Sequence, residues 1–408
     1  MAKQDLLAGI EFGSGKVVCA VAKRDKDGAL NILAGSEVKT TGLQKGNVIS
    51  IEETVNAIKE CVENVEELAG ERVASLQVGI KGQHIETYNF KGAINISRTD
   101  KEITEEDREL VLEAARQLQL SNDREIIETI PLTYIVDQQR GVPNPIGMEG
   151  NHLGVAVHLV SASTMALNNI YKCVNKAGFK VDGVAYSLLA LGDVSVTPEE
   201  KDLGVVLVDI GGQVTDVAFY VMGGIHLTKE LNIGGDHITR DIAYGMRTSL
   251  ERSRELKEKY GWAHRRLVSE NEEKEIPYIG VDGITERVTT FASLSEIIYP
   301  RVEEIFHIVK REILSSEYAH MVPSGIVLAG GTSHLKGICE IGEKILDMPV
   351  RLGPPQSMGM SENYINNPAL SSVFGLLKYA EREQLRISKR LGRKPFFAGM
   401  RKKLEEIF

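Results

Sequence analysis

Cysteine is scarce in this chain of 408 residues, which contains Cys19, Cys61, Cys173 and Cys339. None of the four stands in a C-x-x-C pair, so neither a disulfide framework nor a cysteine zinc site is indicated. The nine histidines show no H-E-x-x-H spacing, which argues against a histidine metal site. We therefore expect a protein of a reducing compartment such as the cytosol.

Long apolar runs are missing as well. No run of about 18 apolar residues occurs. A signal peptide would need an apolar segment near the N-terminus, but that segment contains Asp5 and Glu11. We therefore expect neither a membrane-spanning helix nor a secretory signal peptide. An excess of positive charge is lacking too, because 57 acidic residues outnumber 48 basic ones and the net charge is −9. This balance argues against nucleic acid as a partner.

The C-terminal segment departs from this acidic balance. From Arg386 to Phe408 eight basic and two acidic residues give a local net charge of +6. On a helical wheel the six large apolar residues of 395–408 share about one third of the circumference. Arg401 and Lys403 flank this stripe, where they would reach anionic lipid headgroups. We expect a membrane-binding helix, or alternatively one that docks on a protein groove. Its apolar residues are Phe396, Phe397, Met400, Leu404, Ile407 and Phe408.

A strand, turn and strand pattern occurs twice. In Leu6–Arg24 an apolar run ends at an acid and is followed by Gly13-Ser14-Gly15 and a second apolar run. In Val205–Tyr220 the same order returns around Gly211-Gly212. Glu11 and Asp209 take equivalent places in the two patterns. This repeat predicts a duplicated, two-lobed architecture.

Turns of glycine and serine let backbone N–H groups approach a phosphate closely. If the two hairpins are pseudo-symmetric, Glu11 and Asp209 face one cleft, where Mg²⁺ and its waters would lie between them. A third glycine pair, Gly330-Gly331, closes the buried run Ser324–Gly331. Together these features favour nucleotide binding. Gly15-Lys16 is not a Walker motif, because Ile10 and Val17 stand where that motif needs glycine and a hydroxyl residue.

Between the hairpins lies a segment of different character. Thr104 and Asp107 predict a capped helix start, followed by apolar residues at helical spacing. The runs Ile126–Val136 and Leu153–Val160 then predict strands. We expect 84–162 to form a small inserted α+β module. Farther on, Ile238–Tyr260 and Ser371–Glu383 are predicted to be helical.

The segments GIEFGSGKVVCAV, VVLVDIGGQVTDVAFY, LNIGGDHITRDIA and GIVLAGGTSHLKGI, in this order, resemble the phosphate, purine-side and adenosine motifs of the actin/Hsp70/sugar-kinase superfamily. The inserted segment with ISRTDKEITEEDRELVLEAAR and the basic amphipathic end resemble the FtsA family of actin-like division proteins. The resemblance covers nearly the whole chain. It implies an α/β, actin-like two-lobed ATPase fold with an inserted subdomain and a C-terminal amphipathic helix.

The resemblance also implies a division of the chain. The first lobe would comprise 1–83, 163–195 and 366–385, and the inserted subdomain 84–162 would make assembly contacts. The second lobe would comprise 196–240 and 305–365, with a purine-side subdomain at 241–304. A basic linker, 386–394, would lead to the membrane-targeting helix, 395–408.

Site residues follow from the same motifs, with ATP and Mg²⁺ as the implied ligands. Glu11 and Asp209 would lie near the metal. The implied nucleotide-binding residues are Gly13, Ser14, Gly15, Lys16, Asp209, Gly211, Gly212, Gln213, Gly234, Gly235, Lys257, Glu258, Gly330, Gly331 and Thr332. For Lys257 and Glu258 the alternative is an exposed helical charge pair.

Departures from the family pattern bear on hydrolysis. Glu11 replaces a shorter aspartate, and Gln213-Val214 replaces small or hydroxyl residues. Alignment of Ala185–Gly192 with a helix of related ATPases puts Ala185 where a water-orienting side chain would stand. Because phosphoryl transfer depends on positioned groups, we expect at most slow ATPase activity.

The resemblance implies a filament-forming scaffold that tethers the tubulin-like division protein FtsZ to the cytoplasmic face of the cell membrane at the septum and recruits later division proteins. Two alternatives share the fold. One is a phosphotransferase of the sugar or acetate kinase type, and the other is a pilus-assembly protein with a similar inserted module.

Overall fold

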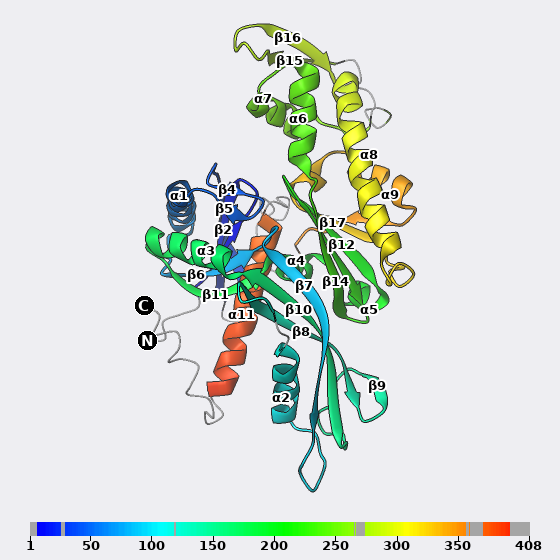
Figure 1. The fold of residues 1–408 in the computed structure, drawn as a ribbon. Coiled ribbons are helices and arrows are strands. Elements are labelled where there is room, and N and C mark those ends of the chain that lie inside the picture. The colour runs from blue at the N-terminus through cyan, green and yellow to red at the C-terminus, as the bar shows by residue number, and fades with distance from the viewer. Residues whose placement is uncertain are drawn as a thin grey trace.

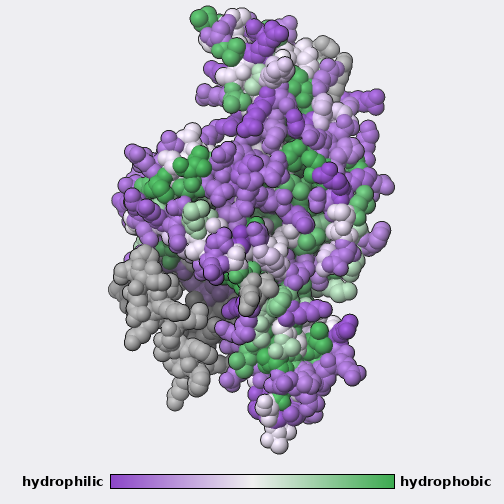
Figure 2. Space-filling model, in the orientation of Figure 1, coloured by the Kyte–Doolittle hydropathy of each residue, from purple (hydrophilic) through white to green (hydrophobic). Residues whose placement is uncertain are grey.

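The computed structural model describes residues 6–25, 29–117, 120–264, 266, 274–355, 359 and 370–391. Two five-stranded sheets lie at the centre of the molecule, and a four-stranded sheet extends from them on one side (Figure 1). Helices and a small hairpin lie at the opposite end. Hydrophilic residues, purple in Figure 2, dominate the face in view, while the apolar side chains gather in buried clusters.

The first sheet has the strand order β11-β6-β1-β2-β3. Strands β1, β2 and β3 are antiparallel neighbours, whereas β1 with β6 and β6 with β11 run parallel. The first predicted hairpin is therefore confirmed as β1 and β2. The strands are β1 (Leu6–Phe12), β2 (Lys16–Arg24), β3 (Leu30–Lys39), β6 (Ser75–Ile80) and β11 (Lys180–Tyr186).

The second sheet repeats this topology. Its order, β14-β13-β12-β17-β18, has antiparallel pairs from β14 to β12 and parallel pairs from β12 to β18. The second predicted hairpin is β12 with β13, so the predicted duplication is confirmed. The strands are β12 (Val205–Ile210), β13 (Thr215–Val221), β14 (Gly224–Leu231), β17 (Ile326–Ala329) and β18 (Val350–Leu352).

Helices bury the faces of both sheets. On the first sheet, apolar residues of α1 (Ile51–Ala69) and α3 (Thr164–Ala177) form one core with the strands, and those of α11 (Ser371–Leu391) form another. On the second sheet, α6 (Gly235–Met246), α8 (Phe291–Ser315) and α9 (Ile338–Leu346) do the same. Helix α4 (Ser187–Ser195) packs Ala190 against the first lobe and Leu188 against the second. This helix therefore joins the two lobes.

The inserted module is a separate sheet of order β7-β10-β8-β9 covered by one helix. Strands β8 and β10 contain the runs predicted as strands, and the helix begins after Thr104 as predicted. Its elements are β7 (Ile85–Asn95), α2 (Glu105–Arg116), β8 (Arg124–Val136), β9 (Gln139–Val142) and β10 (His152–Ser163).

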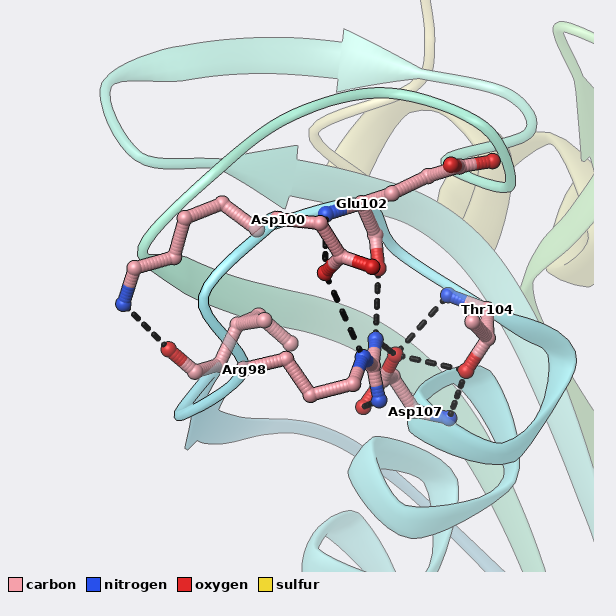
Figure 3. A network of polar contacts seen from close by, with 7 residues as sticks. Arg98, Asp100, Glu102, Thr104 and Asp107 are labelled. Carbon is pink, nitrogen blue, oxygen red and sulfur yellow. Dashed lines mark hydrogen bonds and ion pairs between the residues drawn. The ribbon is translucent and has the colours of Figure 1, made fainter.

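A polar network fixes the start of α2 (Figure 3). Thr104 donates its backbone N–H and its hydroxyl to Asp107 Oδ2 at 2.8 and 2.7 Å, and Arg98 forms an ion pair with the same carboxylate. Although burial raises the pKa of Asp107, hydrogen bonds from Arg98 and Thr104 lower it below its usual value. The charged Asp107 carboxylate thus stabilises the N-terminus of α2.

The segment predicted as one helical region, Ile238–Tyr260, forms two helices. Arg247 adopts a left-handed conformation (φ 51°) that ends α6, and Ser249 caps α7 (Leu250–Tyr260). This end of the molecule also holds the hairpin of β15 (Glu275–Ile279) and β16 (Glu286–Thr290). The remaining short elements are β4 (Leu43–Gln44), β5 (Asn47–Val48), α5 (Pro198–Leu203) and the 3-10 helix η2 (Gly331–His334).

The last body helix was predicted over Ser371–Glu383, and α11 continues to Leu391. It thus extends into the segment expected to be a linker, 386–394. Within the described part of the chain, no helix is both long and apolar enough to cross a bilayer. The predicted membrane-binding segment, 395–408, lies outside the described residues.

Candidate functional site

A cavity of about 450 Å³ lies between the two lobes. Its volume is in the range usual for small-molecule sites. Both glycine hairpins line it, and so do the third glycine pair, Gly330-Gly331, and residues of α7. Segments about two hundred residues apart in the sequence therefore share one site, as predicted.

The two hairpin turns are closed by the same backbone hydrogen bond. The N–H of Gly13 donates to the carbonyl of Lys16 at 2.9 Å, and the N–H of Gly211 donates to the carbonyl of Val214 at 3.0 Å. Gly15 has a φ of 98°, a conformation that side chains disfavour. Equivalent turns thus open into the cavity from both lobes, with no bulky side chain at their glycine positions.

Glu11 and Asp209 lie at equivalent places on β1 and β12, and both are buried. The ammonium group of Lys81 lies between them, 2.9 Å from Glu11 Oε1 and 3.1 Å from Asp209 Oδ2. Burial raises the pKa of Glu11, but the charge and hydrogen bond of Lys81 lower it overall. Burial lowers the pKa of Lys81, but Asp209 and Glu11 raise it overall. An ammonium group therefore stands where the sequence predicted a magnesium ion.

Lys81 was missed by the sequence analysis. It follows β6, whose parallel pairing with β1 brings the ends of the two strands to one edge of the sheet. Ligands in open α/β sheets bind at the carboxyl ends of the strands. A charged residue directly after the apolar run Leu76–Ile80 is the signal that would have pointed to it.

A third acid, Asp216, is buried opposite Asp209 in the pairing of β12 with β13 and also lines the cavity. Burial and the neighbouring Asp209 raise its pKa well above the usual value. The folded structure therefore favours the neutral form of Asp216. Glu11, Asp209 and Lys81 are the ion-paired groups of this cluster.

In the third glycine pair, Gly330 has to be glycine for a steric reason. Gly330 has a φ of 82°, and a Cβ there would lie 2.2 Å from Asp209 Oδ1. Next to it, the Thr332 hydroxyl donates to the Gly211 carbonyl at 2.9 Å. The loop that contains Gly330 and Thr332 is thus held directly against the second hairpin.

Lys257 and Glu258 both line the cavity. The ammonium of Lys257 donates to the Gly235 carbonyl and to the Thr239 hydroxyl, both at 2.9 Å, and burial lowers its pKa. Lys257 is therefore anchored to the start of α6 and differs from the alternative of an exposed pair, whereas Glu258 is exposed as that alternative states. Residues of the wall that the sequence analysis did not identify include Asp236, Arg254, His334, Lys336 and Ser372.

Three predicted nucleotide-binding residues lie outside this wall. Gln213 Oε1 accepts a hydrogen bond from the Lys45 backbone at 3.0 Å, so it links the lobes. The Gly235 N–H donates to the Gly211 carbonyl at 2.9 Å, and a Cβ on Gly234 would lie 2.7 Å from that same oxygen. Gly234 and Gly235 support the second hairpin from behind. The other predicted residues, namely Gly13, Ser14, Gly15, Lys16, Asp209, Gly211, Gly212, Lys257, Glu258, Gly330, Gly331 and Thr332, all line the cavity.

The predicted helical placement of Ala185 is wrong. Ala185 lies in β11, where it is fully buried and pairs with Gly79, and α4 begins at Ser187. The parallel ladder with β6 outweighs the helix preference of small residues here. The membrane-contact residues predicted at Phe396, Phe397, Met400, Arg401, Lys403, Leu404, Ile407 and Phe408 lie outside the described residues.

The arrangement is that of known actin-like proteins. The structure titled "PilM-PilN type IV pilus biogenesis complex" matches with a TM-score of 0.67 and 16% identity over 92% of this chain and 98% of that one. The structure of MreB5 of Spiroplasma citri bound to ADP matches with a TM-score of 0.56 and 14% identity over 95% and 99%. The chain therefore has the actin-like ATPase fold, as predicted.

Sequence comparison identifies the family within this fold. The family model described as "Cell division protein FtsA" matches residues 206–375, and the one described as "SHS2 domain inserted in FTSA" matches residues 82–161. The cell division protein FtsA of Pseudomonas aeruginosa is 37% identical over 93% of this chain and 90% of its own length. The protein of that name from Escherichia coli K12 is 31% identical over 93% and 91%. The chain belongs to the FtsA family of cell division proteins, which confirms the resemblance.

Proposed function

We propose that this chain is an ATP-binding, filament-forming scaffold that tethers FtsZ to the cytoplasmic face of the membrane at the division septum and recruits later division proteins. The proposal of nucleotide binding rests on one observation, namely that two equivalent glycine hairpins, one from each lobe, line one cavity. The similar fold of MreB5, whose structure is titled as bound to ADP, supports the same ligand class.

The nucleotide acts mainly as a structural ligand in this proposal. A triphosphate held by backbone N–H groups of both turns would stabilise the closed arrangement of the lobes. Hydrolysis would be slow, because phosphoryl transfer depends on positioned groups and this chain departs from the family pattern at Glu11 and at Gln213-Val214. Glu11 and Asp209 are engaged with Lys81, so the proposal places no divalent cation between them.

Membrane attachment rests on the sequence of 395–408. Partial burial of six large apolar side chains contributes several kcal/mol at about 25 cal/mol per Å², and each basic residue near anionic lipid adds about 1 kcal/mol. A single helix of this kind is a reversible anchor. Many copies along a filament, with the inserted module 84–162 among the assembly contacts, would bind by avidity.

Nucleotide binding is tested by titrating a fluorescent ATP analogue into the full chain. Gly212→Val places a branched side chain at the second turn, and we expect the affinity to fall at least about tenfold. The matched control is Gly224→Val, at a position where a Cβ meets nothing closer than 3.8 Å. Thermal melts of both variants show whether the fold is intact. Unchanged affinity in a folded Gly212→Val variant would count against the site.

Tethering is tested by flotation of FtsZ with vesicles that contain anionic lipid. We expect FtsZ to float with the vesicles when the full chain is present and to remain in solution when the chain is truncated to 1–394. Electron microscopy of the full chain with ATP on a lipid monolayer tests filament formation. Equal flotation with the full and truncated chains would remove the membrane anchor from the proposal.

A further inference from the structure

Lys81 is a buried cation held by acids of both lobes. Its side chain is 13% exposed, and those of Glu11 and Asp209 are each 4% exposed. Glu11 and Lys81 belong to the first lobe, whereas Asp209 belongs to the second. Buried charges persist in proteins only when they are paired. The two ion pairs therefore form one unit at the wall of the cavity that both lobes share.

The carboxylates of this unit are poorly disposed to hold a divalent cation. One oxygen of each already contacts an ammonium group. A divalent cation placed between them would stand within a few ångströms of that ammonium, and like charges at such distances repel strongly in a buried site. The residues present thus do not fit the ion that the sequence predicted.

Phosphates placed beside these two carboxylates would be repelled by them unless a cation lay close by. A bound nucleotide would bring several negative charges beside the carboxylates of Glu11 and Asp209. Lys81 lines the cavity. An ammonium group has three N–H donors, and two of them meet the carboxylates.

We propose that the Lys81 ammonium takes the place of the divalent cation between Glu11 and Asp209 and donates its third N–H to a nucleotide phosphate, so that nucleotide binding does not depend on Mg²⁺. This inference rests on the proposed nucleotide-binding function and adds how the bound phosphates are neutralised. Nucleotide binding would then act on the contact between the lobes directly, because the phosphate would bind the ammonium group that already links an acid of each lobe.

The test is the affinity of the full chain for ADP, measured by calorimetry in excess MgCl₂ and in excess EDTA. The unaltered chain should bind with affinities that agree within about threefold, a difference below 1 kcal/mol. Lys81→Met should bind at least about tenfold more weakly in EDTA and should recover part of that loss in MgCl₂, because its freed carboxylates can accept the ion. Lys23→Met, which removes an exposed lysine paired with Glu71, should behave like the unaltered chain.

Lys81→Arg keeps the positive charge and serves as a second variant if Lys81→Met does not fold. Thermal melts identify a variant that does not fold, and in that case Lys81→Arg should bind ADP equally in both buffers. Binding by the unaltered chain only in MgCl₂ would overturn this inference and leave the proposed nucleotide site standing. Absence of binding in both buffers would overturn the proposed nucleotide site as well.

Discussion

The backbone N–H of Lys45 donates a hydrogen bond of 3.0 Å to the side-chain oxygen of Gln213. Lys45 lies between β4 and β5 of the first lobe, and Gln213 lies in the second glycine hairpin. The Lys45 ammonium also donates to Asn232 Oδ1 at 2.9 Å. One loop of the first lobe therefore holds the hairpin of the second lobe.

Gln213→Ala should loosen this contact without unfolding the chain. A hydrogen bond of this kind is worth about 1 kcal/mol, so we expect the affinity for ATP to fall about fivefold. Hydrogen exchange should be faster at the Lys45 amide, while the amides of α1 keep their protection. An unaltered exchange rate at Lys45 would show that Gln213 does not hold the lobes together in solution.

Gly330→Ala should destabilise the protein, whereas Gly331→Ala should not. A Cβ on Gly330 would meet Asp209 Oδ1 at 2.2 Å with φ at 82°, but a Cβ on Gly331 meets nothing within 4 Å. We expect the free energy of unfolding to fall by more than about 1 kcal/mol for Gly330→Ala. Urea denaturation of the two variants measures this difference. Equal stability of the two would contradict the close packing of this loop on Asp209.

Asp107→Ala should destabilise the start of α2 in the inserted module. Loss of the capping contacts with Thr104 and Arg98 costs about 1–2 kcal/mol. The control is Asp100→Asn, because Asp100 is exposed and lies 3.7 Å from Arg98, a pair worth less than about 1 kcal/mol. Hydrogen exchange of residues 105–116 reports the local effect. Faster exchange in both variants alike would contradict the role of Asp107.

The contribution of Asp107 should also depend on pH in a defined direction. Its pKa is lower in the folded protein than the usual 3.8, so the folded state favours the charged form. The stabilisation is then complete above about pH 4 and is lost as the pH falls through the folded pKa. Protection of α2 should therefore decrease on acidification below about pH 4 in the unaltered chain. In the Asp107→Ala variant, the protection of α2 should decrease less over the same pH range.

Local sequence patterns were sufficient for the elements that carry the site. The hairpin predicted over Leu6–Arg24 corresponds to β1 and β2, because an apolar run interrupted by glycine and serine has few other stable conformations. The pairing of Lys81 with Asp209 could not be found in this way, since the two residues are 128 positions apart in the sequence. Ala185 was misplaced for a related reason, because its pairing with β6 is non-local.

Co-crystallisation of the full chain with ATP is the measurement that tests the central claim most directly. The account predicts a triphosphate in the cavity between the lobes, with backbone nitrogens of both turns, 13–15 and 211–212, within about 3.2 Å of phosphate oxygens. A nucleotide held by one hairpin alone, or bound away from this cavity, would contradict it.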